Sequence, residues 1–321
     1  MKAVKIHQRG GTEVLQLEEV ATPVPQQGEV LIQVAVAGVN YADVGQRQGN
    51  YPNLAELPLT LGSEVAGTVV KCGPGVDASL EGRRVVSLVS AGYAEFALAK
   101  AEEVIPLVNG VSFAQATVIP VQGQTAYLLL DKATRLQKGE RVLVHAAAGG
   151  VGSLAVQLAK SMGASMVIGT TTSQSKLGFI RDLGADVAVI SKGASWIGQV
   201  MQATSGQGVD IILDPIGGEF GQQNIACLAP FGRIVVFGSL SGGVTPFVSQ
   251  MLIPKCQSII GYNTVIQSHE DKMRASQALM QMIASGQLHI FIDHSFPLTE
   301  VATAHKELEE NKTMGKVVLT V

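Results

Sequence analysis

Two patterns of apolar residues divide the chain. The first part, about 120 residues long, contains short apolar runs bounded by glycine and proline, and such runs are typical of β-strands. The clearest runs are Val30–Val36, Glu64–Val70 and Arg84–Val89. They predict a compact, barrel-like, β-rich domain.

From about Val121 onward, predicted strands alternate with predicted helices. Apolar runs rich in β-branched residues predict the strands Arg141–Ala146, Ser165–Thr170, Val187–Ile190, Val209–Asp214, Arg233–Phe237 and Ser258–Gly261. Apolar residues at helical spacing predict the helices Val151–Met162, Lys176–Leu183, Ala194–Ala203 and Glu219–Leu228. Six strands separated by helices indicate an α/β fold with a doubly wound, six-stranded parallel sheet of the Rossmann type.

The pattern leaves the sheet after Tyr262. Helices are predicted at Asp271–Ser285 and Thr299–Glu309, with a turn at Pro297 between them and a last strand at Lys316–Val321. We expect this tail to return to the first domain. Residues 1–121 and 264–321 are therefore predicted to form one discontinuous domain, and residues 122–263 to form the Rossmann domain.

Composition narrows the class of protein. The 321 residues are 46% hydrophobic and 15% charged, with a net charge of -3, which excludes a disordered chain and provides no basic field for nucleic acid. The three cysteines lack metal-ligand spacing, no apolar stretch is long enough to span a membrane, and the first residues do not resemble a signal peptide. We expect a reduced, cytoplasmic protein with no membrane or nucleic-acid partner.

A glycine-rich turn carries the first functional prediction. Ala147-Ala148-Gly149-Gly150-Val151-Gly152 joins the first strand of the alternation to a helix. Small residues allow a tight turn, a close approach of backbone to a pyrophosphate, and close packing of helix on strand. The pyrophosphate would then lie at a helix N-terminus, where free N–H groups and the helix dipole favour negative charge. The turn therefore predicts a dinucleotide site formed by Ala148, Gly149, Gly150 and Val151.

The end of the second strand indicates which dinucleotide binds. An NAD site would offer a carboxylate there, about 20 residues after the turn. Here the chain has hydroxyls and a lysine, including Thr170, Ser173 and Lys176, and no acid before Asp182. A carboxylate would repel a 2′-phosphate, whereas these groups would accept it. We therefore predict NADPH as the cofactor.

The chain resembles the medium-chain dehydrogenase/reductase superfamily and, within it, the zinc-free quinone oxidoreductases related to zeta-crystallin. The resemblance runs nearly end to end. Its marks are Ala37–Asp43, Leu61–Gly67, Gly92–Phe96, Gln122–Tyr127, the glycine turn, Gly232–Val235 and Gly315–Leu319.

The resemblance implies a GroES-like catalytic domain split around the Rossmann domain, and a homodimer whose Rossmann sheets meet near Gly243–Tyr262. It also implies that several further residues approach the cofactor, mostly at its nicotinamide end. These are Asn40, Thr125, Phe237, Gly238, Ser239 and Lys316.

Departures from the zinc-dependent members of the superfamily argue against a metal. Those enzymes carry a cysteine where Asn40 stands and a histidine where Ser63 stands, and zinc needs three or four N, S or O ligands. The histidines show no ligand spacing, and His145 is interpreted as a packed strand residue. Gly45 stands where relatives commonly have a tyrosine, which leaves the shape of the substrate pocket open, whereas Arg47 and Tyr51 match the family pattern.

Without a Lewis acid, the enzyme should prefer acceptors that take hydride readily, such as quinones or α,β-unsaturated carbonyls. Tyr51 is the candidate proton donor, and Tyr41, Arg47 and Tyr262 are candidates for the substrate pocket. The alternatives are an NADPH-dependent enoyl or alkenal reductase, and a non-catalytic NADPH-binding or RNA-binding protein of the same fold. A zinc-dependent dehydrogenase is disfavoured by the missing ligands.

Overall fold

The alternating strands and helices of the middle of the chain fold as one unit, Gln122–Ala275, and Met1–Val121 with Ser276–Val321 fold as another. We refer to them as the nucleotide unit and the catalytic unit. The computed structural model describes residues 1–243 and 245–321. The two units meet along the chain between Val121 and Gln122 and again inside helix α8 (His269–Ala284), and the domain bounds given above, 1–121 with 264–321 and 122–263, stay a prediction.

Charged contacts explain why the first turns of α8 belong to the nucleotide unit. The Arg274 guanidinium donates to Asp131 Oδ2 at 2.8 Å, and Asp271 pairs with Lys132. The later part of α8 instead contributes buried apolar side chains, among them Leu279 and Ile283. Helix α8 therefore contributes side chains to both units.

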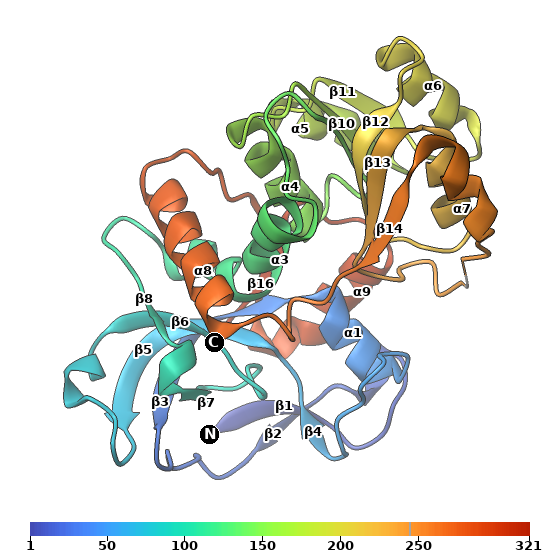
Figure 1. Cartoon of the computed structure of the whole chain (residues 1–321). Helices are drawn as coiled ribbons and strands as arrows, with labels where there is room; N and C mark the ends of the chain where they lie inside the picture. The colour runs from blue at the N-terminus through green and yellow to red at the C-terminus, as the bar shows by residue number, and fades with distance from the viewer. Residues whose placement is uncertain (244) are drawn as a thin grey trace. The chain divides into compact units, whose positions relative to one another are not determined.

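The nucleotide unit is built on a parallel sheet with the strand order β11-β10-β9-β12-β13-β14. Its strands are β9 (Arg141–Val144), β10 (Met166–Thr171), β11 (Val187–Ile190), β12 (Val209–Asp214), β13 (Leu228–Val236) and β14 (Ser258–Gly261). Helices α4 and α5 lie on one face of the sheet and α6 and α7 on the other (Figure 1). The longer helices are α3 (Gln124–Leu128), α4 (Gly150–Ser161), α5 (Leu177–Asp182), α6 (Ser195–Ala203) and α7 (Glu219–Ala226). This arrangement confirms the predicted doubly wound fold.

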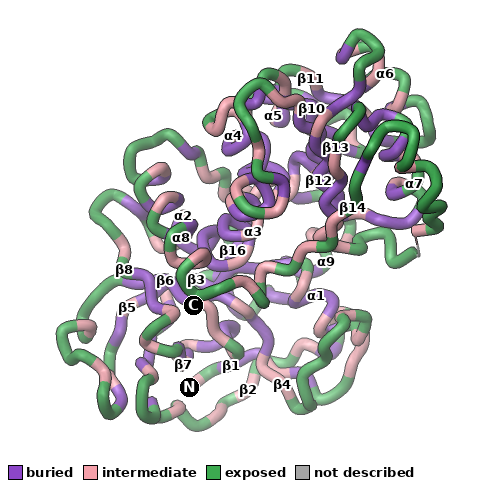
Figure 2. Tube along the Cα trace, viewed as in Figure 1, coloured by how far each residue is buried: buried purple, intermediate pink, exposed green. Residues whose placement is uncertain are grey.

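Buried apolar residues on neighbouring strands form the core of this sheet. Strands β9, β10 and β12 are buried along most of their length (Figure 2), as expected for parallel strands covered on both faces, whereas the edge strand β14 is mostly exposed. One residue from each of five adjacent strands contributes to the same cluster: Val189, Ile168, Leu143, Ile212 and Ile234.

Strand β13 differs most from its prediction, because it begins at Leu228 and not at Arg233. Phe231 has a positive φ of 60° and is 75% exposed, and the pairing with β12 shifts register between Val209 and Ile211. Pro230, Phe231 and Gly232 therefore interrupt the apolar pattern without ending the strand.

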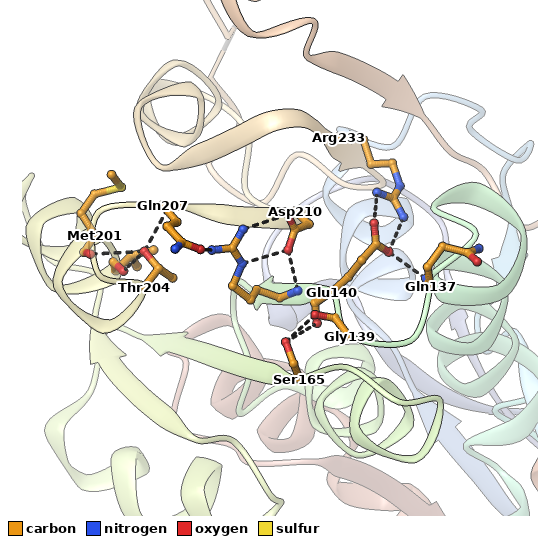
Figure 3. Close-up of polar contacts among 12 residues, drawn as sticks. Gln137, Gly139, Glu140, Ser165, Met201, Thr204, Gln207, Asp210 and Arg233 are labelled. Carbon is orange, nitrogen blue, oxygen red and sulfur yellow. Dashed lines mark hydrogen bonds and ion pairs between the residues drawn. The ribbon is translucent and has the colours of Figure 1, made fainter.

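Ion pairs join the amino ends of the central strands. Arg233 donates to both carboxylate oxygens of Glu140, at 2.8 and 2.7 Å, and Arg141 forms a two-bond contact with Asp210 (Figure 3). Burial by itself would raise the pKa of Asp210, but hydrogen bonds from Arg141 outweigh it and lower that pKa. Because these contacts lie at the strand end opposite the glycine turn, we assign them to stability.

The catalytic unit contains two sheets. A three-stranded antiparallel sheet has the order β2-β1-β4, and a seven-stranded sheet has the order β15-β16-β3-β5-β6-β8 with β7 also paired to β3. The strands are β1 (Lys2–Ile6), β2 (Gln16–Glu19), β3 (Glu29–Val39), β4 (Leu59–Thr60), β5 (Glu64–Cys72), β6 (Arg84–Leu88), β7 (Phe96–Lys100), β8 (Ile105–Pro106), β15 (Ile292–Pro297) and β16 (Lys316–Thr320). The pairing of β16 with β3 confirms that the tail returns to the first domain.

The helices of the catalytic unit are short. They are α1 (Tyr41–Gln48), α2 (Phe113–Ala116), α9 (Val301–Glu309) and the later part of α8. Single helical turns occur in both units: η1 (Thr12–Val14), η2 (Ala78–Leu80), η3 (Ala101–Glu103), η4 (Ile119–Gly123), η5 (Leu129–Ala133), η6 (Gln174–Lys176), η7 (Ser249–Lys255) and η8 (Leu298–Glu300). Over the described residues, no helix has both the length and the apolar character needed to cross a bilayer.

Candidate active site and dinucleotide site

The glycine turn begins directly after β9. The strand ends at Val144, two residues earlier than predicted, because the backbone already turns at Ala146, whose φ is 50°. The Ala147 N–H donates to Thr170 O at 2.9 Å, which joins the turn to β10. Gly149 is the N-cap of α4 and has no side chain to satisfy the first N–H groups of the helix. These groups provide an anion site at a helix N-terminus.

Small residues are required at two positions of the turn. A Cβ on Gly152 would lie 2.3 Å from Ala146 O, so the helix could not pack as closely on the strand. A Cβ on Gly150 would lie 2.3 Å from the side-chain amide of Gln122. The strand order reverses between β9 and β12, and nucleotides bind at such switch points in doubly wound sheets. The turn therefore fits a pyrophosphate.

The residues at the end of β10 that were predicted to bind the 2′-phosphate differ in their burial. Thr170 is fully buried, and its hydroxyl pairs with His145 Nδ1 at 2.9 Å. Ser173 Oγ lies 2.8 Å from Ser175 Oγ, and Lys176 follows in η6 as a half-buried residue. Ser173 and Lys176 are thus at the accessible end of the strand, and their contact with a 2′-phosphate stays a prediction, as does that of Thr170.

His145 directly follows β9, although the predicted strand included it, and its side chain is buried. Its Nε2 lies 2.7 Å from Asn224 Oδ1, and Asn224 Nδ2 donates to Asp214 Oδ2 at 2.9 Å. Burial lowers the pKa of His145, which keeps the ring neutral. Asp214 Oδ1 in turn accepts from two backbone N–H groups of the turn after β12. This network fixes the turn beside the switch point.

The remaining predicted cofactor residues of the nucleotide unit follow β13 and β14. Phe237 and Gly238 come after β13, where a Cβ on Gly238 would lie 2.7 Å from Pro215 O. Ser239 is exposed beside them. Tyr262 follows β14, and two residues later Thr264 Oγ1 lies 2.9 Å from Thr125 Oγ1. The structure thus gathers these residues at the carboxyl edge of one sheet, and their contacts with the cofactor stay predictions.

A buried ion pair lies in the catalytic unit where β3, β5 and β16 meet. The Lys316 ammonium pairs with Glu64 Oε1 and donates to Asn40 Oδ1 at 3.2 Å, while Asn40 Nδ2 donates to Glu64 Oε1 at 2.8 Å. The side chains of Lys316 and Glu64 are 1% and 0% exposed. A Cβ on Gly38 would lie 2.2 Å from Glu64 Oε1, so glycine is needed to admit the carboxylate. The structure shows Lys316 in contact with Glu64 and Asn40, and the predicted contact of Lys316 with the cofactor stays a prediction.

Asp43 is the centre of a second buried cluster. It accepts the Asn40 N–H at 2.9 Å and the Tyr93 hydroxyl at 3.1 Å on Oδ2, and the Ser63 hydroxyl at 3.0 Å on Oδ1. Burial raises the pKa of Asp43 to about 6, Glu64 adds to the increase, and the hydrogen bonds and Lys316 oppose it. Tyr93 Oη also lies 3.2 Å from His305 Nε2. This cluster holds a carboxyl group that titrates near neutral pH.

The predicted substrate residues lie in different environments in the structure. Arg47 is fully buried in the catalytic unit, where it pairs with Glu309 and lies 3.4 Å from His305 Nδ1. Tyr41, the first residue of α1, is 41% exposed. Tyr51 is half-buried near Gly45, where an added Cβ would lie 3.3 Å from its ring. The contacts of all three with substrate, and of Tyr262, stay predictions.

The side chains at the positions of the zinc ligands do not suit a divalent cation. Asn40 presents an N–H to Glu64, and the Lys316 ammonium already supplies the positive charge that the carboxylate needs. A cation would be repelled by this ammonium. Among residues 1–243 and 245–321, no group of three His, Cys, Asp or Glu side chains is arranged to hold a metal ion.

Several residues of these clusters had no predicted role. Asp43, Glu64 and Tyr93 lie inside motifs that marked the family resemblance, so their neighbourhood was visible in the sequence although their contacts were not. His305 and Asn224 lie on helices without any distinguishing pattern. Only the fold brings them to the site.

His305 should make folding stability depend on pH. Burial, with a contribution from Arg47, lowers the pKa of His305 to about 3, against 6.5 in the unfolded chain. The unfolded state therefore binds more protons below pH 6.5, and stability falls as the pH falls through that value. We expect His305 to account for about 2 kcal/mol of lost stability between pH 6.5 and 5.

Urea unfolding across this pH range would measure the effect. His305→Asn should flatten the slope by that amount, and His294→Asn, which removes a histidine whose side chain is 45% exposed, is the control. Asp43 has an opposite dependence, because its raised pKa favours the folded state at low pH, but it is present in all three proteins. Equal slopes for wild type and His305→Asn would contradict the prediction.

Two family models match the chain. The "Alcohol dehydrogenase GroES-like domain" matches residues 26–130, and the "Zinc-binding dehydrogenase" model matches residues 150–295. The chain is also 33% identical to the quinone oxidoreductase of Rattus norvegicus over 323 residues, which covers 99% of this chain and 97% of the relative.

Solved structures agree with these matches. A mycobacterial protein complexed with NADPH has a TM-score of 0.94 at 34% identity, and the match covers 100% of both chains. Escherichia coli quinone oxidoreductase complexed with NADPH has a TM-score of 0.92 at 30% identity, again over 100% of both chains. The similarity therefore extends over the whole chain.

Proposed function

Because this chain belongs to the quinone oxidoreductases of the medium-chain dehydrogenase/reductase superfamily, and is therefore an oxidoreductase, we propose that it reduces quinones with NADPH by direct hydride transfer and without zinc. The observation that carries the proposal is the pairing of Asn40 and Lys316 with Glu64, at a place where zinc-dependent relatives hold their metal.

The two units contribute separately to this function. The N-terminus of α4, with Gly149 and Gly150, would bind the pyrophosphate, and Ser173 and Lys176 would bind the 2′-phosphate. NADPH, when bound, supplies the hydride. The catalytic unit contributes the acceptor side, where we propose that Tyr41 and Tyr51 contact the substrate.

The ion pair between Lys316 and Glu64 would favour conjugated acceptors. An ammonium held by a buried carboxylate cannot coordinate a carbonyl oxygen as an open metal site does. An acceptor must then stabilise its own negative charge after hydride transfer. Quinones do this most effectively, since the product is an aromatic hydroquinone anion, and enones do so less well through an enolate.

NADPH oxidation with 1,2-naphthoquinone and with a simple enone would test the proposal, together with identification of products and metal content. We expect quinone reduction that a chelator leaves unchanged. Saturation of the enone with no quinone turnover would instead favour the alternative of an enoyl or alkenal reductase. Activity that required about one zinc per chain would overturn the metal-free mechanism.

Lys176 should set the preference for NADPH over NADH. Lys176→Ala removes the cation proposed to bind the 2′-phosphate, so the KM for NADPH should rise about tenfold while that for NADH changes little. Lys160→Ala is a matched control, because Lys160 lies at the other end of α4 and pairs with Asp186 at 3.0 Å. Equal kcat/KM values of the wild-type enzyme for NADPH and NADH would contradict an NADPH preference altogether.

We also propose a homodimer formed through the segment Gly243–Tyr262, of which residue 244 lies outside the described residues. The segment exposes apolar side chains, including Phe247, Val248, Met251 and Ile253. Burial of such side chains would favour association. Sedimentation of wild type and an Ile253→Glu variant would test this.

A further inference from the structure

A pocket of the catalytic unit has a hydroxyl and a carboxyl group in its wall. Its volume is about 170 Å³, and its lining includes Asp43, Gln46, Leu59, Leu61, Ser63 and Val89. Most of this lining is apolar. Ser63 and Asp43 are joined by the hydrogen bond described above, 3.0 Å between Ser63 Oγ and Asp43 Oδ1. The pocket therefore meets one end of the buried Asp43 cluster.

The direction of each hydrogen bond in that cluster follows from chemistry. Arg47 can only donate, so His305 Nδ1 accepts from it and the ring proton is on Nε2. His305 Nε2 then donates to Tyr93 Oη, and the Tyr93 hydroxyl must donate to Asp43 Oδ2. The Asn40 N–H donates to the same oxygen. Two donors thus occupy Oδ2, and a proton bound by Asp43 lies on Oδ1, facing Ser63.

Protonation of Asp43 would reverse the bond to Ser63. An ionised Asp43 accepts the Ser63 hydroxyl, whereas a protonated Asp43 donates to Ser63 Oγ and frees the Ser63 O–H to point into the pocket. Burial raises the pKa of Asp43 to about 6, so both forms are populated near neutral pH. The groups that face Asp43 are Glu64 on β5, Lys316 on β16, Ser63 before β5, Tyr93, and, through Tyr93, His305 on α9 with Arg47 behind it.

We propose that Ser63 is a catalytic residue that gives the acceptor its proton, and that Asp43 resupplies it; this inference rests on the proposed function. The acceptor gains a hydride, with two electrons, from NADPH, which is oxidised to NADP⁺. The Ser63 O–H bond breaks as an O–H bond forms on the reduced acceptor, and the Asp43 O–H bond breaks as the Ser63 O–H bond is restored. The Asp43 carboxylate then takes a proton from water.

Single-turnover oxidation of NADPH by 1,2-naphthoquinone would test the assignment in the full-length enzyme. Ser63→Ala should slow the step by roughly a hundredfold and abolish its solvent deuterium isotope effect, with the Kd for NADPH unchanged. Ser63→Thr keeps the hydroxyl and should recover most of the rate and the isotope effect. Ser63→Ala with the wild-type rate would overturn the proposal, as would retention of the isotope effect in Ser63→Ala with its loss in Tyr51→Phe.

Asp43→Asn separates proton supply from position. Its amide NH₂ would donate to Ser63 as protonated Asp43 does, and its carbonyl would accept from Asn40 and Tyr93, but it cannot release a proton. In the wild type the rate should fall as the pH rises above about 6, and in Asp43→Asn this limb should disappear, leaving a slow, pH-independent rate. A limb that persists in Asp43→Asn would overturn the role of Asp43.

Two controls keep the outcomes distinct. Thermal melting identifies variants that fail to fold, and Ser63→Ala, at a half-exposed position, then carries the test if Asp43→Asn unfolds. A wild-type enzyme that binds NADPH but reduces neither quinone nor enone would overturn the proposed function and this inference together. A wild-type enzyme that turns over normally, with Ser63→Ala equal to it, would overturn this inference alone.

Discussion

Lys316→Met should destabilise the protein by about 3 to 5 kcal/mol. The side chain of Lys316 is 1% exposed and its ammonium is the cation that faces the buried Glu64 carboxylate. Methionine nearly preserves the volume but leaves that carboxylate with hydrogen bonds from the Asn40 side chain at 2.8 Å and the Val121 N–H at 3.1 Å and without its counter-ion. A buried charge that loses its counter-ion costs far more than the pair contributes when intact.

The double variant Glu64→Gln/Lys316→Met separates charge from packing. Without either charge, it should recover a large part of the lost stability, because the glutamine oxygen can still accept one of the two bonds that Asn40 and Val121 give to the two oxygens of Glu64. Lys312→Met is the matched control, since Lys312 pairs with Glu310 on the surface at 63% exposure, where solvent screens the ion pair and its loss should change stability little. The midpoints of urea unfolding of the wild type and the three variants would test this prediction. A Lys316→Met variant as stable as the wild type would show that Glu64 does not need a counter-ion in the folded protein.

The comparison of sequence with structure shows which features local patterns can predict. Strands β11, β12 and β14 begin and end at the predicted residues. Strand β12 is buried and rich in apolar residues, as expected for a parallel strand covered on both faces, whereas β14 is mostly exposed at the edge of the sheet. Strand β13 was predicted to begin five residues too late, because an exposed Phe231 with a positive φ is not typical of a strand. Local pattern therefore locates regular strands and fails where the backbone departs from regular geometry.

The two buried clusters around Glu64 and Asp43 were only partly predictable for a different reason. Asn40, Ser63 and Lys316 were singled out by the resemblance, but their contacts were not, because these depend on distant segments: Lys316 comes from β16, and His305, which reaches Asp43 through Tyr93, comes from α9. Nothing local in a helix such as Val301–Glu309 distinguishes a buried histidine from a surface one. The pairing of β16 with β3 brings these segments together, and that pairing is a property of the fold.

Gly152→Val should lose folding stability, whereas Gly149→Val should fold but bind NADPH more weakly. A Cβ at position 152 would lie 2.3 Å from Ala146 O and 2.8 Å from Ala147 Cα, both backbone atoms that cannot move without separating α4 from β9. We expect Gly152→Val to lose several kcal/mol of stability, about 3 or more, and to melt well below wild type. NADPH binding would be lost with the fold.

A side chain at position 149 would be much less crowded within the protein than one at position 152. Its φ and ψ are -82° and 179°, an ordinary extended conformation, and the one close atom for a Cβ is Ala146 O at 3.3 Å. Gly149→Val should therefore melt near wild type. Its side chain would instead occupy the space at the N-terminus of α4 that the proposed pyrophosphate needs, because close approach of backbone is what glycine permits there. We expect NADPH binding to weaken by at least tenfold, about 1.4 kcal/mol.

Thermal melting and NADPH fluorescence titration of the two variants together test the placement of the cofactor. If Gly149→Val melted normally and bound NADPH as wild type does, the pyrophosphate would not lie on this turn, whatever the family resemblance implies. If Gly152→Val melted normally, the close contact of α4 with the turn would be wrong. The two positions are three residues apart on the same turn, so a general weakness of the region would affect both melting curves, whereas the predicted pattern separates binding from folding.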